Sequence, residues 1–293
     1  MKLNPVYLKE SKTSSRTVKT AVIILLFNGV LAAVAFLNLY SMVESLRYTG
    51  EVQFSSMLEL YMLIAEFEFA MLLLVMPALT SGSISGERER QTLDLLLSTK
   101  MRPRQIIIGK LLSALEVASI LILSTFPILS LVFIYGGLKM LDLFFLYLYF
   151  LVTAFFVGSI GIMFSSVFKK TMISTVVSYL TEVVLLGGSY LIVYFAKQVS
   201  DIHYSTDIVA EQTGAGGAVY LLITNPGVNF YSFINQQAGN RRALKELLGG
   251  FFNYSENFFF NNWVTIGIVL QIAVAVVCIY IAVKAIDPGR KRF

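Results

Sequence analysis

Long apolar blocks dominate the hydrophobic pattern of the chain, and polar residues are confined to stretches between them. A helix needs about 20 apolar residues to cross a hydrocarbon core of about 30 Å. The blocks therefore predict an all-α polytopic membrane protein with six transmembrane helices. Their approximate ranges are 18–41, 60–84, 106–135, 140–167, 172–196 and 263–285. The blocks lack the period-two alternation of barrel strands, which argues against a closed β-barrel.

Three segments outside the blocks carry further information. Residues 4–10 mix apolar and charged side chains and have Pro5 at a first helical position, which favours a short interfacial helix. A second segment joins the second and third blocks. The third, 197–262, is a long segment outside the membrane, in which 218–233 and 243–260 are apolar enough to form short helices. We find no internal repeat, so residues 1–293 are predicted to form a single transmembrane domain.

The composition strengthens the membrane prediction. Hydrophobic residues make up 56% of the chain and charged residues 14%, with a mean hydropathy of +0.73. Soluble globular chains carry about 25% charged residues. Cys278 is the only cysteine, so an intrachain disulfide scaffold is excluded.

The 23 Lys and Arg residues are distributed unevenly between the two sides of the predicted membrane. Most lie near the two termini, in the segment after the second block, and in the short connector before the fifth. Basic residues concentrate on the cytoplasmic side of membrane proteins, so both termini are expected in the cytoplasm. This placement beside apolar blocks also argues against a nucleic-acid-binding surface. The opposite side carries Arg47, Lys139, Lys197, Arg241, Arg242 and Lys245.

Motifs of the common enzyme classes are missing from the sequence. There is no Gly-x-x-x-x-Gly-Lys-Ser/Thr phosphate loop, so ATP hydrolysis by that machinery is excluded. His203 is the only histidine, which excludes a His-Glu-x-x-His metal site and a Ser-His-Asp triad. We therefore expect no enzyme activity, no catalytic residue, no metal site and no cofactor in this chain.

The segment 81–100 is the most informative part of the sequence. It begins with small residues, passes through a charged run at 87–90, and continues as a leucine-rich amphipathic stretch to residue 99. Leu93, Leu96 and Leu97 have the i, i+3, i+4 spacing of one apolar helix face. Glu87 and Glu89 come early, where carboxylates suit the positive end of a helix. The simplest alternative is a surface helix that joins two spans and has no binding role.

This segment resembles the coupling region of ABC-2-type permeases, the membrane subunits of ATP-binding-cassette exporters. In that family a small-residue turn leads into Glu-Arg-Glu, then into Thr-Leu and Leu-Leu pairs, and a Gly-Lys pair opens the next span, here Gly109-Lys110. The Asn-Pro-Val opening and Lys-Glu pair within residues 4–10 are also similar, so the resemblance covers essentially the whole chain. The chain departs from the family at Gln91, where glycine is usual, and at Lys100, where proline often follows the leucine-rich helix.

The resemblance implies a transmembrane subunit of an exporter in the cell membrane. Such a subunit forms the translocation path with a second protomer, a copy of itself or a homologue, and is surrounded by membrane lipid. Separate ATPase subunits bind ATP and Mg, and the leucine-rich face is expected to be buried in a groove of the ATPase. The residues implied at this interface are Glu87, Arg88, Glu89, Arg90, Thr92, Leu93, Leu96, Leu97, Lys169 and Lys170.

Several acidic residues fall within the predicted spans, and three of them are considered for the translocation path. Glu182 lies about a dozen residues beyond Lys170, hence roughly 18 Å into the membrane at 1.5 Å per residue. A carboxylate at that depth usually faces a cavity or a partner. With Glu66 and Glu68 of the second span, it is a candidate for the translocation path. An acidic lining favours a cationic or amphipathic cargo such as a peptide or antibiotic, whereas a bond from Glu182 to Ser178 would indicate a structural role.

Two other classes of function remain open from the residues alone. Buried acids also occur in ion-coupled secondary transporters and channels. Those transporters commonly show inverted repeats or broken half-helices, which we do not find in this sequence. A membrane scaffold or sensor without transport is the other alternative. Copurification with an ATPase whose activity depends on this chain would separate the exporter from both.

Overall fold

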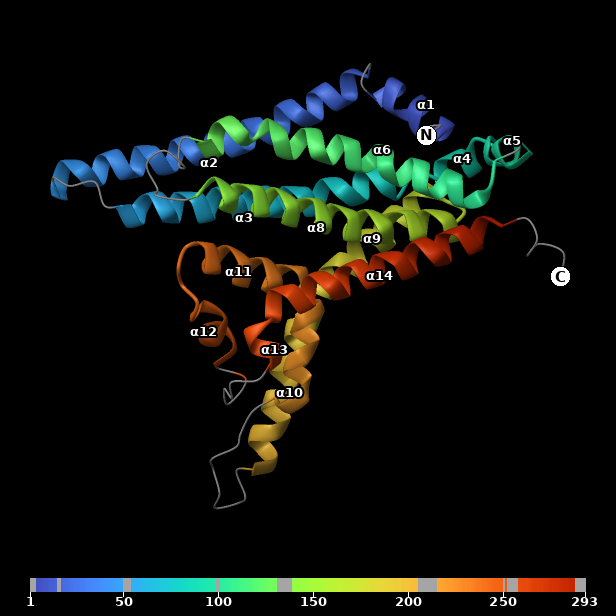
Figure 1. Cartoon of the computed structure of the whole chain (residues 1–293). Coiled ribbons are helices and arrows are strands. Elements are labelled where there is room, and N and C mark those ends of the chain that lie inside the picture. Colours follow the sequence, from blue (N-terminus) through green and yellow to red (C-terminus); the bar gives the residue numbers. More distant parts are fainter. Residues whose placement is uncertain are drawn as a thin grey trace. The chain divides into compact units, whose positions relative to one another are not determined.

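A computed structural model of the chain is shown in Figure 1. It describes residues 4–14, 17–49, 54–98, 101–130, 139–204, 215–249, 251 and 258–287. All regular secondary structure in these ranges is helical. The chain separates into two compact units: unit 1 contains Met1–Tyr179 and Val274–Phe293, and unit 2 contains Leu180–Ala273.

Within the described ranges, six helical stretches are long and apolar enough to cross a membrane, which confirms the predicted number of spans and the all-α class. Each corresponds to one of the predicted blocks. The stretches are Thr20–Glu44, Met57–Glu89, Pro103–Ser130, Met140–Val167, Thr171–Ile202 and Trp263–Ile286.

One predicted span contains a break, and one predicted boundary differs from the structure. The third span is broken at Thr125, shortly before Pro127, because proline lacks an amide hydrogen and crowds the preceding turn. Its predicted end at 131–135 lies outside the described residues. The fifth span was predicted to end at 196, but its helix continues to Tyr204, so His203 belongs to a helix rather than to a loop.

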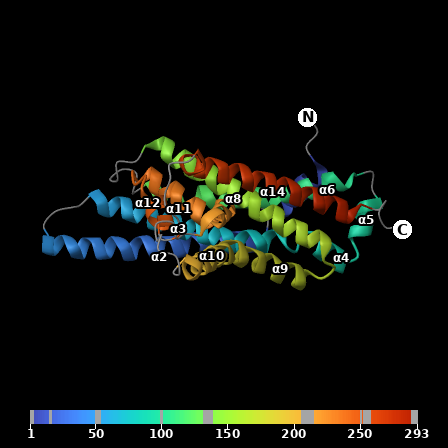
Figure 2. The ribbon, with the colours of Figure 1, turned by 90° about the horizontal axis from the view of Figure 1, so that it is seen from below.

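Unit 1 is a bundle in which α3, α6 and α8 run side by side (Figures 1 and 2). Helix α2 packs against α3 and α6, and the short α1 packs against α6. The helices that lie wholly within this unit are α1 (Pro5–Ser14), α2 (Val18–Thr49), α3 (Phe54–Thr80), α4 (Ser85–Glu89), α5 (Leu93–Ser98), α6 (Pro103–Ser124) and α8 (Met140–Val167).

Glycine allows the close approach of α3 and α8. A Cβ added at Gly161 would lie 2.0 Å from the Thr80 hydroxyl oxygen, and one at Gly158 would lie 2.8 Å from Met76 Cε. Small residues at such positions let helix backbones approach closely within a membrane. This contact fixes the end of α3, from which the Glu-Arg-Glu segment begins.

Unit 2 combines part of the fifth span with the predicted outside segment. Its core gathers Trp263, Phe260, Val219, Leu222 and other apolar side chains. Short helices occupy both ranges where they were predicted, although 205–214, 250 and 252–257 lie outside the described residues. The elements are the π-helical η1 (Val184–Gly188), α10 (Ser189–Tyr204), the 3-10 helix η3 (Gly216–Thr224), α11 (Pro226–Gln237), α12 (Ala243–Gly249) and α13 (Phe258–Asn261).

Helices α9 (Thr171–Val183) and α14 (Trp263–Ile286) each contribute residues to both units. The connections between the units are therefore helical. A single domain over residues 1–293 stays a prediction.

Candidate functional site

Helix α4 is anchored at its start by a side chain of α8. The hydroxyl oxygen of Ser165 accepts hydrogen bonds from the backbone amides of Ile84 at 2.8 Å and Ser85 at 3.0 Å. The first amides of a helix have no partner within the helix and need one from elsewhere. Ser165 and Ser85 are both fully buried, so these bonds are shielded from water.

Arg88 binds the end of α8. Its guanidinium donates hydrogen bonds to the backbone carbonyls of Ser166 at 2.9 Å and Phe168 at 3.0 Å. The last carbonyls of a helix are unpaired and carry partial negative charge, so a cation is favourable there. Arg88 therefore caps α8 from a neighbouring element.

Glu89 has the complementary role at the start of α9. Its two carboxylate oxygens accept hydrogen bonds from the Thr171 backbone amide at 2.9 Å and the Thr171 hydroxyl at 2.8 Å. A carboxylate at a helix N-terminus satisfies a free amide and interacts favourably with the helix dipole. Consecutive residues of α4 thus hold the end of one span and the beginning of the next.

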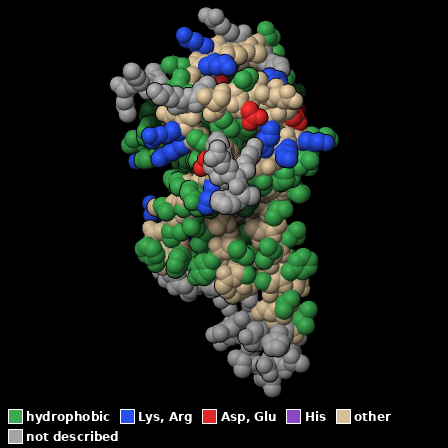
Figure 3. All heavy atoms as spheres, turned by 90° about the vertical axis from the view of Figure 1, so that its right-hand side faces the viewer, with side chains coloured by type: hydrophobic (Ala, Val, Ile, Leu, Met, Phe, Trp, Pro, Cys, Tyr) green, Lys and Arg blue, Asp and Glu red, His purple; other side chains and the backbone are tan. Residues whose placement is uncertain are grey.

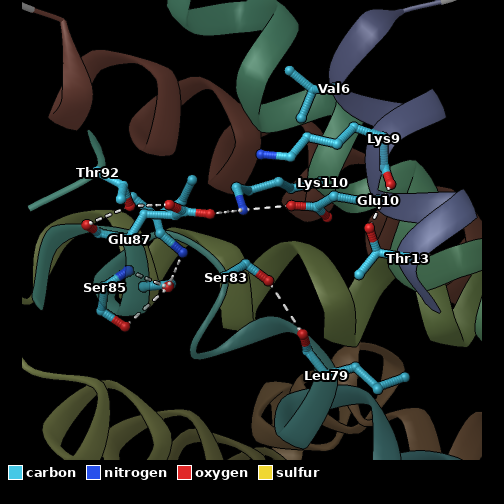
Figure 4. A network of polar contacts seen from close by, with 12 residues as sticks. Val6, Lys9, Glu10, Thr13, Leu79, Ser83, Ser85, Glu87, Thr92 and Lys110 are labelled. Carbon is cyan, nitrogen blue, oxygen red and sulfur yellow. Dashed lines mark hydrogen bonds and ion pairs between the residues drawn. The ribbon is translucent and has the colours of Figure 1, made fainter. Parts of the chain in front are cut away.

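Glu87 belongs to an ion network centred on Lys110 of α6 (Figure 4). The Lys110 ammonium lies 2.6 Å from a Glu10 carboxylate oxygen of α1 and 3.3 Å from one of Glu87. Only 4% of the Lys110 side chain is exposed, whereas 31% of the Glu10 side chain and 27% of the Glu87 side chain are exposed. Glu87 also accepts a hydrogen bond from the Thr92 hydroxyl. One buried cation thereby links α1, α4 and α6.

Helix α1 is fixed along α6 by further contacts. The Asn4 side-chain amide donates to the Gln105 carbonyl at 2.6 Å, and the Ser11 hydroxyl donates to Glu116 at 2.9 Å. The negative charge of Glu116 also raises the pKa of the Tyr7 phenol. The predicted amino-terminal helix is therefore part of the same assembly as the Glu-Arg-Glu segment.

Gln91 interrupts the leucine-rich stretch. Its φ of 57° is the only positive value at a non-glycine residue in the described ranges, and it separates α4 from α5. The prediction of one amphipathic stretch over 87–99 is corrected to two short helices joined by a left-handed residue. Glycine adopts this conformation without a steric penalty, which gives a physical reason for glycine at this position in the resembling family.

The leucines turn mainly towards the chain's own core. Leu93 is 5% exposed and packs in a cluster with Ile84 and Ile106. Leu96 and Leu97 are partly buried against the same cluster. The chain itself buries the Leu93 side chain, and the expectation that Leu93 contacts the ATPase stays a prediction.

The outer face of the same region is both apolar and basic. Leu95 is 68% exposed. Arg90, Lys169 and Lys170 are also exposed. Figure 3, which views the end of unit 1 that carries α4 and α5, shows basic side chains spread around this end. The other exposed basic residues of unit 1 in the described ranges are Lys9, Lys12, Arg47, Arg102, Arg104, Lys139 and Lys284.

The acidic residues of the spans lie in different environments. Glu66 is exposed on α3, whereas Glu68 is fully buried and accepts a hydrogen bond from the Thr125 hydroxyl at 2.8 Å. The helices of unit 1 therefore enclose Glu68 in the single chain, and its place in a translocation path stays a prediction. In unit 2, Glu182 is 7% exposed, and its Oε1 has no hydrogen-bond partner among the described residues. Ser178 donates instead to the Ser174 carbonyl at 2.7 Å.

Comparison with known proteins identifies the family of this chain. Residues 5–283 match the family model described as ABC-2 family transporter protein. The chain belongs to the ABC-2 transporter family. A search of curated proteins finds no match for this permease. The family match confirms the predicted resemblance and favours an ABC transporter permease over a secondary transporter or channel. Members of the family are membrane subunits that associate with an ATP-binding-cassette ATPase and are not themselves catalytic.

Several residues that organise this permease were not singled out by sequence reasoning. Glu10, Ser165 and Thr171 hold the Glu-Arg-Glu segment from three other elements. Lys110 was noted only as part of a Gly-Lys pair. Serine and threonine near helix ends are common caps, but the sequence does not show which distant helix they cap.

Proposed function

We propose that this permease couples transport to a separate ATPase through an outer face formed by Leu95, Arg90, Lys169 and Lys170. The single observation that carries the proposal is the division of the segment into two sides. Glu87 pairs with Lys110 of α6, and Arg88 and Glu89 hold the ends of α8 and α9. Leu93 fills the core, whereas Leu95 remains exposed.

The bonding of the inner side suggests how force could pass from the ATPase to the membrane. A push on α5 is transmitted through α4 to the end of α8 by Arg88 and to the start of α9 by Glu89. The same push reaches α6 and α1 through Lys110. Packed helices and hydrogen-bond networks of this kind carry coupling between distant sites.

The experiment is copurification of the ATPase with a Leu95→Asp variant. Loss of a leucine from an interface costs on the order of 1–3 kcal/mol, so binding should weaken roughly 5- to 150-fold. The matched control is Met140→Asp, because Met140 is 59% exposed and begins α8, at the opposite end from Arg88's contacts. Wild-type assembly and transport by the Leu95→Asp variant would reject the coupling face.

The proposal includes the orientation and the assembly in the cell membrane. If the coupling face meets a cytoplasmic ATPase, both termini lie in the cytoplasm, as the basic residues suggest. A second protomer is supported by the low burial of the first and fifth spans. In the apolar part of the first and fifth spans, 17% of the residues are buried. The corresponding share is 61% in the third and fourth spans. The remaining surface is available to a second copy or homologue and to membrane lipid.

We further propose export of a cationic or amphipathic cargo such as a peptide or antibiotic. Glu66 supports this, because its carboxylate is exposed on a span. Glu182 also supports an acidic path, because it is a buried acid whose Oε1 has no hydrogen-bond partner among the described residues. A Glu66→Gln variant should transport a cationic probe more slowly and a neutral amphipathic probe at the wild-type rate. Equal rates for the cationic probe would contradict the acidic path.

A further inference from the structure

Both polar atoms of the Asn225 side chain make hydrogen bonds within unit 2. Its side-chain oxygen accepts from the backbone amides of Gly227 at 2.8 Å and Val228 at 3.2 Å, which caps the start of α11. Its amide nitrogen donates to the Leu186 carbonyl at 2.7 Å and the Ser189 hydroxyl at 2.8 Å. A side-chain amide offers two hydrogens and one oxygen with two lone pairs, so all four bonding positions are used. Asn225 is 2% exposed, so water does not readily replace these bonds.

The segment that receives the two donated bonds is unusual. Leu186 lies in η1, a single π-helical stretch between the α-helical parts of the fifth span, and Ser189 directly follows it. The Ser189 backbone amide donates to the Val184 carbonyl five residues earlier, which is the π-helical pattern. Single π-turns within α-helices are rare and occur frequently at functional sites.

A π-turn contains one residue more than the α-helical turn that would replace it. Conversion to regular α-helix would rotate the preceding residues by about 100° and shift them by about 1.5 Å relative to those that follow. Glu182 lies just before η1 and would move from its buried position in the same step. The π-turn therefore differs from a regular α-helix in this span by a single step of register.

We propose that Asn225 is a positioning residue that holds the fifth span in its π-helical register and links this register to α11. Movement of α11 away from the span breaks the bonds to Leu186 and Ser189. The π-turn then converts to α-helix and turns Glu182. The outside helix thereby controls the orientation of an acidic residue within the span. This inference rests on contacts within unit 2 and does not depend on the ATPase interface.

The test is a distance measurement between two spin labels on the full-length chain in lipid nanodiscs. The labels are placed by Leu180→Cys and Phe195→Cys in a Cys278→Ala background. Both sites belong to unit 2 and are exposed, at 59% and 62%, on either side of η1. Fifteen residues separate them, or about 22 Å along a helix. A change of register rotates one label about the helix axis and produces a second distance.

Two substitutions break the bond to Leu186 and keep a capping oxygen for α11. These are Asn225→Ser and Asn225→Asp, since serine and aspartate are both good N-caps. The matched controls are Asn235→Ser and Asn235→Asp, because among the described residues the Asn235 side-chain amide bonds only within α11, to the Tyr231 carbonyl at 2.9 Å. Hydrogen exchange of residues 226–229 checks that the cap is retained.

We expect one distance in the parent and the Asn235 variants, and a second population in both Asn225 variants with exchange at 226–229 unchanged. Unchanged distances in a folded Asn225→Ser or Asn225→Asp variant would overturn the inference. An equal second population in the Asn235 variants would also overturn it, because the change of register would not depend on Asn225.

Discussion

Replacing Lys110 with methionine removes the cation that joins three elements of the candidate site. Methionine keeps most of the length and apolar character of the lysine stem, so the change deletes the charge with little change in packing volume. Glu10 and Glu87 then lose their common partner, whose ammonium lies 2.6 and 3.3 Å from them. We expect α1 to loosen from α6 and the Glu-Arg-Glu segment to lose one of its three attachments.

The size of the effect follows from the burial of the three groups. Removing one partner of a fully buried ion pair costs about 3–5 kcal/mol. Here the lysine is buried, but the carboxylates are 31% and 27% exposed, so water relieves part of the loss. We therefore expect a destabilisation of about 2 kcal/mol, which corresponds to a fall in Tm of about 4–8 °C on the scale of medium-sized domains.

The chain contains its own probe for this measurement. Cys278 is the only cysteine and is buried, so a thiol-reactive fluorescent dye reports unfolding as the thiol becomes accessible. The matched control is Lys169→Met, which deletes the same charge at an exposed position. Exposed lysines contribute little to stability, so its Tm should change by less than about 1 °C. Equal Tm values for Lys110→Met, Lys169→Met and the wild-type chain would refute the network's structural role.

Two further predictions concern the backbone. Gln91→Gly should raise the Tm slightly and Gln91→Val should lower it. A left-handed conformation costs a residue with a side chain roughly 1–2 kcal/mol, and the cost is highest for β-branched residues. The opposite order of Tm values in the same dye assay would contradict the left-handed turn. Gly161→Ala should destabilise the chain by about 1–3 kcal/mol through overpacking against Thr80. Gly29→Ala, which has open space around it, serves as the control, and equal Tm values for the two variants would argue against the close packing of α3 and α8.

Span positions were predictable because membrane crossing imposes a length of apolar sequence that is visible without a structure. The helix start at Pro5 was predictable from the local sequence alone, since proline suits a first helical position. The break at Thr125 was missed because proline within a membrane span is often accommodated without a break.

The partners of the Glu-Arg-Glu segment could not be predicted from local pattern. Arg88 bonds residues 78 and 80 positions away, and Glu89 bonds Thr171, 82 positions away. Helical periodicity placed Leu93 on an apolar face but could not say whether that face meets another protein or the chain's own core. The departure from glycine at Gln91 did mark the place where the structure has its left-handed turn.

The proposed coupling face is tested most directly by photo-cross-linking in the complete transporter. A photoreactive amino acid is placed at Leu95 in one variant and at Met140 in another, and cross-links to the ATPase are identified by mass spectrometry. Leu95 should cross-link to the ATPase, whereas Met140, at the far end of α8, should not. Cross-linking from Met140 but not from Leu95 would show that the ATPase binds the opposite end of the permease and would contradict the proposed coupling.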